Sequence, residues 1–130
     1  MNNPIEMVQS LFAAFGRGDI DFILSHIAAD AAWTAPGPSV IPSAGRYSGP
    51  AGVAEFFRKL SDSELVTRFE PREFFANGNT VVALGVEECQ SRKTGKSAAT
   101  NWAMSFRIDD GKVTQWETYY DTAAYALAHS

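Results

Sequence analysis

The sequence predicts a single α+β domain in which three N-terminal helices pack against one curved antiparallel sheet, forming a cone with an open end. Apolar residues recur at helical spacing as far as Leu60, and apolar and polar residues then alternate in the manner of strands. This segregation of helices and strands along the chain is typical of α+β domains and not of parallel α/β sheets. In residues 100–121, aromatic residues alternate in a predicted hairpin, which we interpret as the back wall of a pocket.

Each of the three helices begins with a capping signal. Asn3 and Pro4 open the first, Asp19 caps the second, and Gly49 precedes the third. The apolar stripes of the three helices are Val8, Leu11, Phe12, Phe15; then Ile20, Ile23, Leu24, Ile27; then Val53, Phe56, Phe57, Leu60. We expect these stripes to face the sheet.

The strand predictions follow from alternation and from turn residues. A short strand over 31–35 contains Trp33, and a loop rich in proline and glycine follows over 36–48. The strand over 65–75 is interrupted by Pro71, which favours an edge position or a bulge. Asn77-Gly78 predicts a hairpin turn before a strand over 81–89, and a turn near Thr94-Gly95 leads into the hairpin of 100–121. Residues 122–128 are expected to form a short helix.

The register of the last hairpin decides which side chains line the pocket, because a slip of one residue exchanges the two faces. A two-residue turn would place Trp116 on the more polar face. We therefore predict a three-residue turn with Gly111 in the left-handed conformation, which pairs Met104 with Trp116 and Trp102 with Thr118. This register gathers Trp102, Met104, Phe106, Trp116, Thr118 and Tyr120 on one surface.

Composition narrows the possible partners. The 130 residues suit one domain spanning 1–130, and a hydrophobic content of 45% is enough for a core. The net charge is −4 and the basic residues are scattered, so we expect no nucleic acid partner. Cys89 is the one cysteine, no apolar run is long enough for a membrane helix, and no signal peptide is visible. We therefore expect a cytoplasmic protein that binds no membrane.

Four short motifs carry a resemblance to a known family. They are Gly18-Asp19, Asp30-Ala31-Ala32-Trp33, Tyr47-Ser48-Gly49-Pro50 and the segment from Phe106 to Asp121. With them, the chain resembles the SnoaL-like and ketosteroid-isomerase-like branch of the nuclear transport factor 2-like superfamily over almost its whole length. The resemblance implies the cystatin-like, nuclear transport factor 2-like fold. It implies no single activity, because this superfamily hosts isomerases, hydrolases, cyclases and non-catalytic binders.

The resemblance also allows known catalytic sets to be compared with this sequence. The tyrosine, aspartate and acidic donor of the steroid isomerases correspond here to Leu11, Ala35 and Met104, none of which can do that chemistry. Of the aspartate, arginine and aspartate of the limonene-epoxide-hydrolase branch, only one carboxylate survives, as Glu87. Neither mechanism is supported, whereas a SnoaL-like cyclase with an acidic acid/base residue stays open.

Glu87 is the best-placed catalytic candidate. A two-residue turn at Thr94-Gly95 would set it opposite Trp102 and point it into the apolar pocket, where desolvation raises a carboxyl pKa. A three-residue turn would instead turn Glu88 inward. In a third interpretation both carboxylates are exposed near Arg92. The sequence does not decide which of Glu87 and Glu88 faces the pocket.

The substrate-binding candidates are mostly aromatic side chains that would orient a small hydrophobic molecule through indole N–H and phenol O–H groups, although they could equally fill the core. These candidates are Trp33, Tyr47, Trp102, Met104, Trp116, Thr118 and Tyr120. No cofactor or metal is expected, since His26 has no companion at metal-ligand spacing and Thr94 to Ser97 only copies the tail of a P-loop.

Two functions therefore remain. The first is a cofactor-independent acid/base enzyme of isomerase, cyclase or hydrolase type. The alternative is a non-catalytic ligand-binding or protein-interaction module. The family resemblance implies a homodimer, formed through the other sheet face, where we expect Ala103, Ser105, Val113 and Tyr119.

Overall fold

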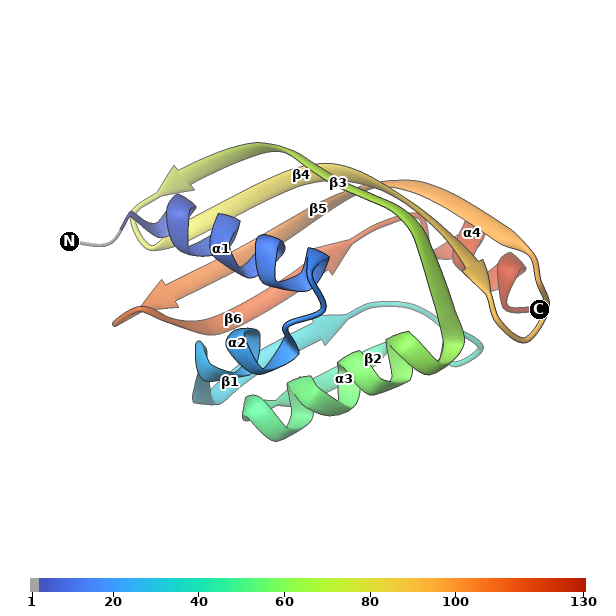
Figure 1. The fold of residues 1–130 in the computed structure, drawn as a ribbon, viewed down its shortest axis with the longest axis horizontal. Helices are drawn as coiled ribbons and strands as arrows, with labels where there is room; N and C mark the ends of the chain where they lie inside the picture. The colour runs from blue at the N-terminus through green and yellow to red at the C-terminus, as the bar shows by residue number, and fades with distance from the viewer. Residues whose placement is uncertain (1–2) are drawn as a thin grey trace.

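A computed structural model describes residues 3–130, and within this range four helices and six strands follow one another (Figure 1). They are α1 (Pro4–Gly16), α2 (Ile20–Ser25), β1 (Ile27–Ala35), β2 (Gly45–Ser48), α3 (Gly49–Ser63), β3 (Glu64–Asn77), β4 (Thr80–Ser91), β5 (Ser97–Asp109), β6 (Lys112–Tyr119) and α4 (Thr122–Ala128). No helix among the described residues is long and apolar enough to cross a membrane.

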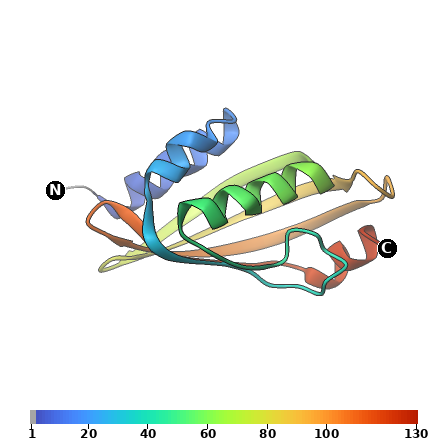
Figure 2. The same cartoon turned by 90° about the horizontal axis from the view of Figure 1, so that it is seen from below.

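The six strands form one curved sheet in the order β2-β1-β6-β5-β4-β3. Helices α1, α2 and α3 cover one face of this sheet, and α4 lies at the end where the chain terminates (Figures 1 and 2). The predicted α+β fold, with three helices against a curved sheet, is confirmed. Two details differ: β1 pairs with β6 in parallel, and the predicted loop over 36–48 contains the short strand β2.

The predicted helix caps are present. The Asn3 side chain accepts a hydrogen bond of 2.9 Å from the backbone N–H of Ile5, and Asp19 accepts one of 3.1 Å from that of Phe22. Helix α2 is shorter than predicted because it ends at Ser25, so that Ile27 belongs to β1. Strand β1 therefore begins before the predicted residue 31, and Ile27 contributes to the core as its first residue and not as part of a helix.

Strand β3 lies at the edge of the sheet, and its pairing with β4 shifts register between Pro71 and Glu73. Proline has no N–H to donate to a neighbouring strand, so the edge and the bulge that Pro71 predicted both occur. Asn77 pairs with Thr80, which places the hairpin turn at Gly78 and Asn79. The turn is thus displaced by one residue from the predicted Asn77-Gly78, and Gly78 adopts the left-handed conformation with φ of 62°.

The hairpin of β5 and β6 combines a tight turn with a bulge. Asp110 and Gly111 both have positive φ, 51° and 74°, as a two-residue type I′ turn requires. Ile108 then pairs with Val113, whereas the preceding Arg107 pairs with Gln115, so one extra residue lies in β6. The predicted three-residue turn is wrong, and the bulge supplies the residue that we placed in the turn.

The bulge changes the predicted pairs but keeps the predicted inward set. Met104 lies opposite Thr118 and Phe106 opposite Trp116, two residues away from the predicted pairing. Because side chains alternate with a period of two, an offset of two leaves the same residues on the inner face. Val113, on the turn side of the bulge, is fully buried, and its predicted place on the outer face is therefore wrong.

The core has a main cluster between the three N-terminal helices and the sheet, and a smaller cluster under α4. The smaller one consists of Ile41, Cys89, Ala98, Tyr125 and Ala128. Burying a large apolar side chain contributes about 1.5 to 3 kcal/mol, so these contacts hold α4 against the sheet. The position of α4 matters because it delivers two polar side chains to the interior.

Candidate functional site

A cavity lies between the helices and the inner face of the sheet. It encloses about 850 Å³ of space, open solvent at its mouth included. Its walls are mostly aromatic and aliphatic, with carboxyl and hydroxyl groups among them. The lining comprises Leu11, Phe12, Phe15, Ile23, Trp33, Ala35, Ser43, Phe56, Phe57, Leu60, Glu64, Phe69, Glu87, Thr100, Trp102, Met104, Phe106, Trp116, Thr118, Tyr120 and Tyr125.

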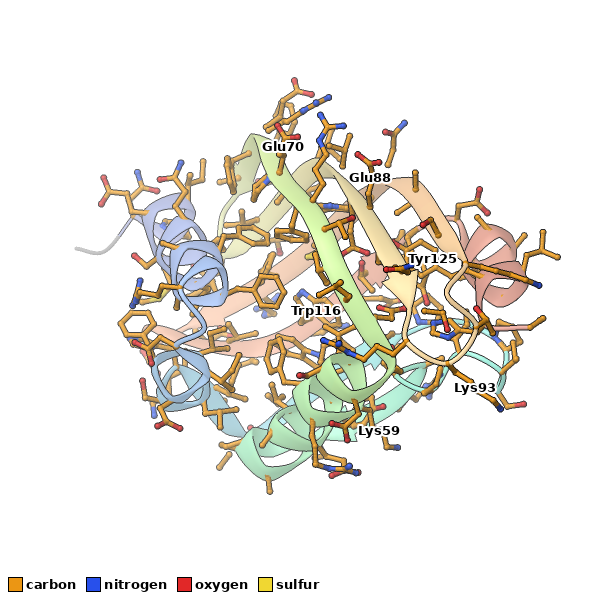
Figure 3. The ribbon with its side chains drawn as sticks, turned by 45° about the vertical axis from the view of Figure 1, so that its right-hand side comes forward. Lys59, Glu70, Glu88, Lys93, Trp116 and Tyr125 are labelled. Carbon is orange, nitrogen blue, oxygen red and sulfur yellow. The ribbon has the colours of Figure 1, made fainter. Side chains whose placement is uncertain are left out.

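Two stacked aromatic pairs form the walls. The rings of Trp33 and Trp116 are 4.1 Å apart at an interplanar angle of 18°, and those of Phe69 and Trp102 are 5.1 Å apart at 10°. Figure 3 shows Trp116 in the interior, where strand β3 crosses in front of it. Flat parallel rings of this kind present broad apolar faces to a ligand.

Gly85 makes room for one of these stacks. It pairs with Trp102 across β4 and β5, and a Cβ atom at this position would overlap the Trp102 ring and the carbonyl oxygen of Glu70. The absence of a side chain therefore lets the Trp102 ring lie against the strand. The glycine is required by this close approach and not by its backbone angles.

Six of the seven predicted binding residues line the cavity: Trp33, Trp102, Met104, Trp116, Thr118 and Tyr120. Tyr47 does not. Its ring packs against Phe56 at 5.5 Å, and its hydroxyl donates a 2.9 Å hydrogen bond to the carbonyl oxygen of Ser43. The residue thus holds the loop between β1 and β2 in place, and the predicted contact of Tyr47 with substrate is not supported by this position.

The indole N–H and phenol O–H groups that we expected to orient a ligand differ in whether they already donate a hydrogen bond within the protein. The Tyr120 hydroxyl already donates to the carbonyl oxygen of Pro36 at 2.9 Å, so this residue offers its ring and not its O–H group. The indole N–H groups of Trp33 and Trp102 are buried without an acceptor among residues 3–130. A buried donor without an acceptor costs about 1 to 3 kcal/mol, so both indoles carry an unmet hydrogen-bonding demand.

Glu87 points into the cavity. It lies opposite Thr100, and Trp102 is opposite Gly85, because the β4–β5 connection is longer than either turn considered from the sequence. The neighbouring Glu88 faces outward (Figure 3). There it forms an exposed ion pair of 3.2 Å with Arg68. The sequence left the choice between the two glutamates open, and the structure places Glu87 inside.

The surroundings of Glu87 favour its neutral form. Burial in the apolar cavity raises the pKa of its carboxyl to about 7, and the negative charge of Glu64 acts in the same direction. The Tyr125 hydroxyl donates a hydrogen bond to Glu87 and opposes this rise. A carboxyl group with a pKa near neutrality can both give and take a proton under physiological conditions.

A second carboxyl group, which the sequence analysis missed, lies at the same end of the cavity. Glu64 is the first residue of β3 and is only 4% exposed. Its Oε1 lies 3.0 Å from Nε2 of His129, the residue that caps α4. Burial raises the pKa of Glu64, and the hydrogen bond and charge of His129 work against this rise. No local pattern in the sequence pairs residues so far apart.

Three other groups considered from the sequence lie outside this chemistry. Cys89 is buried, and burial raises the pKa of its thiol to about 12. Nδ1 of His26 lies within hydrogen-bonding distance of the Ser25 hydroxyl and of the carbonyl oxygen of Phe22, both on the preceding helix α2. Residues 92–96, at the P-loop-like segment, connect β4 to β5. Among residues 3–130, no group of three potential metal ligands comes together.

The chain is similar to a known protein family and to several solved structures. A family model described as a SnoaL-like domain matches residues 8–116. An NTF2-like protein from Burkholderia xenovorans LB400 is 32% identical, covers 98% of this chain and 95% of its own, and gives a TM-score of 0.89. No curated protein matches the chain.

Two further solved structures are similar. TerC, co-crystallized with polyporic acid, is 31% identical over 97% of both chains, with a TM-score of 0.84. A candidate polyketide cyclase from Xanthomonas campestris pv. campestris is 25% identical, covers 98% of this chain and 96% of its own, and has a TM-score of 0.77.

Proposed function

This chain belongs to the SnoaL-like domain family, and on this premise we propose that it binds a small apolar or aromatic molecule in the cavity and acts on it by acid/base chemistry through Glu87, without a cofactor. The proposal rests on one observation. Glu87 faces an aromatic cavity, and its burial there raises the pKa of its carboxyl group to about 7. A general acid or base works best when its pKa lies near the working pH.

The walls support an aromatic or polycyclic ligand. Stacked indole and phenyl rings offer flat faces to a planar molecule, and Met104 and Thr118 complete the inner surface beside them. The related TerC was co-crystallized with polyporic acid. Polyporic acid is therefore the first ligand to test, followed by aromatic ketones, hydrophobic epoxides and polyketide-like compounds.

Binding can be measured without a label. The chain has three tryptophans, and all three line the cavity, so quenching of intrinsic fluorescence reports its occupation directly. We expect saturable quenching by aromatic ligands. Replacing Phe69 by alanine should weaken binding, whereas replacing the exposed Phe75 on the same strand should not. Equal affinity of both variants would place the ligand elsewhere.

Acid/base activity can be tested before the natural substrate is known. An aromatic ketone with an exchangeable α-hydrogen is incubated with the protein in D2O, and incorporation of deuterium is followed by NMR. Glu87→Gln should lower the exchange rate by about 100-fold or more, the usual contribution of general acid/base catalysis. The control is Glu88→Gln, which removes the outward carboxylate of the same strand. Binding without exchange in the wild type would favour the non-catalytic binding module.

We also propose a homodimer formed through the outer face of the sheet, in a cytoplasmic location. Tyr119 is 51% exposed on this face and lines a polar hollow with Ser105 and Gln115. Light scattering during gel filtration should give twice the chain mass of 14.1 kDa. Tyr119→Arg should convert the dimer to monomer, and a wild-type monomer would contradict the proposal.

A further inference from the structure

Both carboxyl groups of the cavity are held by one short element, α4. Tyr125 of α4 donates to Glu87 on β4, and His129 at the end of α4 contacts Glu64 on β3. The smaller apolar cluster docks the helix, and Thr94 also donates to the carbonyl oxygen of Ala128. The helix therefore closes the polar end of the cavity while orienting two acidic side chains in it.

The two partners supplied by α4 differ in the charge they can carry. The Tyr125 hydroxyl is neutral, because burial and the nearby carboxylates raise its pKa well above the ordinary value. The His129 imidazole lies 3.0 Å from Glu64, and its hydrogen bond and charge both lower the pKa of that carboxyl group. Among the described residues, the partner of Glu64 on this helix therefore favours the ionised carboxylate by charge as well as by hydrogen bonding, whereas the partner of Glu87 acts by hydrogen bonding.

From this division we propose that Glu64, oriented by His129, is a second acid/base group of the cavity, and that it accepts a proton from the ligand while Glu87 donates one. The proposal rests on the function proposed above. In this step the ligand loses a proton from one atom to a Glu64 carboxylate oxygen and gains one at an oxygen from Glu87, so its charge is unchanged. Proton exchange with solvent at the mouth restores both carboxyl groups.

Other titratable groups near the pair do not disturb this assignment. Cys89 on β4 and Tyr120 after β6 face the two glutamates, and burial raises the pKa of Cys89 to about 12 and that of Tyr120 well above its usual value. Both are therefore neutral near pH 7. No lysine, arginine or histidine is among the cavity-lining residues within 3–130. Burial, the Tyr125 hydrogen bond and the charge of Glu64 are thus what set the protonation of Glu87.

The experiment is an NMR titration of the glutamate side chains in protein labelled with ¹³C at the carboxyl carbons. The Glu87 signal is assigned with Glu87→Gln. In Glu64→Gln, removal of the like charge should lower the midpoint of Glu87 below the wild-type value of about 7. The control is Thr94→Val, which removes an uncharged tie between α4 and the sheet and should leave the midpoint in place.

The same variants are tested for deuterium exchange. Glu64→Gln and His129→Gln should each lower exchange by about 10-fold or more while tryptophan quenching still shows ligand binding. Thr94→Val should keep the wild-type rate. A pH profile with two inflections in the wild type, reduced to one in Glu64→Gln, is the expected signature of a working pair.

The outcomes separate this inference from the proposed function. If Glu87→Gln abolishes exchange but Glu64→Gln changes neither the Glu87 midpoint nor the exchange rate, the second role is wrong and Glu87 acts alone. If neither variant affects exchange, the proposed function itself fails. Should Glu64→Gln not fold, the wild-type titration still decides, because a Glu64 that ionises at higher pH than Glu87 overturns the assignment.

Discussion

Replacing Glu87 by glutamine should stabilise the protein, and only above acidic pH. In the folded chain the pKa of Glu87 lies at about 7, against an ordinary value of 4.5. A carboxyl group whose pKa is raised by folding binds its proton more tightly in the folded state. The contribution of Glu87 to the free energy of unfolding is therefore fully favourable below pH 4.5. It declines as the pH rises from 4.5 to about 7, and it stays constant at higher pH. Glutamine does not titrate and removes this decline.

The size of the effect follows from the same two values. One pKa unit corresponds to about 1.4 kcal/mol, so the interval from 4.5 to about 7 represents about 3 kcal/mol. For a chain of 130 residues, this corresponds to roughly 10 °C in Tm. Tyr125 can still donate to the amide oxygen of the glutamine, so the substitution removes the charge with little loss of hydrogen bonding.

The assay is thermal unfolding followed by circular dichroism at about pH 4 and about pH 8. The wild type should lose about 3 kcal/mol relative to Glu87→Gln between these two conditions. Glu88→Gln is the matched control, because its carboxylate lies in an exposed ion pair and should change stability by less than about 1 kcal/mol. Parallel pH curves for the wild type and Glu87→Gln would refute the burial argument.

Three shorter predictions concern the same interior. Gly85→Ala should destabilise the fold by about 2 to 3 kcal/mol in urea unfolding, because the added methyl group overlaps the Trp102 ring and strand backbone; wild-type stability would mean that the ring moves at no cost. Tyr125→Phe should move the NMR titration midpoint of Glu87 above about 7, because the Tyr125 hydrogen bond stabilises the ionised carboxylate and the variant lacks it. A lower midpoint would contradict this. Cys89 should resist iodoacetamide at neutral pH until the chain unfolds, because its thiol pKa is about 12, and rapid labelling of the folded protein would show an accessible thiolate.

The fold could be predicted from local signals because most of its elements are marked in the sequence. Asn3 and Asp19 cap helices through bonds to backbone groups within three residues, so the signal and the contact are adjacent in the chain. Pro71 likewise indicates, from its own position in the sequence, the edge strand and the bulge in which it lies. The parallel pairing of β1 with β6 has no such marker, since paired residues such as Trp33 and Trp116 lie far apart in the sequence.

The site was predictable only in part, for a related reason. The aromatic residues could be assigned to one face because alternation fixes which side chains share a surface, whereas the choice between Glu87 and Glu88 depended on the length of a turn and stayed open. Glu64 and His129 are 65 positions apart and meet because α4 folds back onto the sheet, so no periodicity connects them. For Tyr47, an aromatic residue beside a loop suggested a ligand contact, and in the structure its hydroxyl donates a hydrogen bond to the carbonyl oxygen of Ser43.

The extra residue in β6 ties the length of the last hairpin to the identity of its inner face. Losing one residue between Arg107 and Gln115 would keep Trp116 opposite Phe106 only if the bulge disappeared with it. A loss of one residue that kept the bulge would instead direct Trp116 and Thr118 outward, whereas losing two would leave the parity of the strand intact. Insertions and deletions at this turn should therefore survive in even numbers, or in odd numbers with a compensating change in the bulge. An alignment of relatives that closes a single-residue gap across the hairpin would equate cavity residues with surface residues, and sites transferred from it would lie on the wrong side of the sheet.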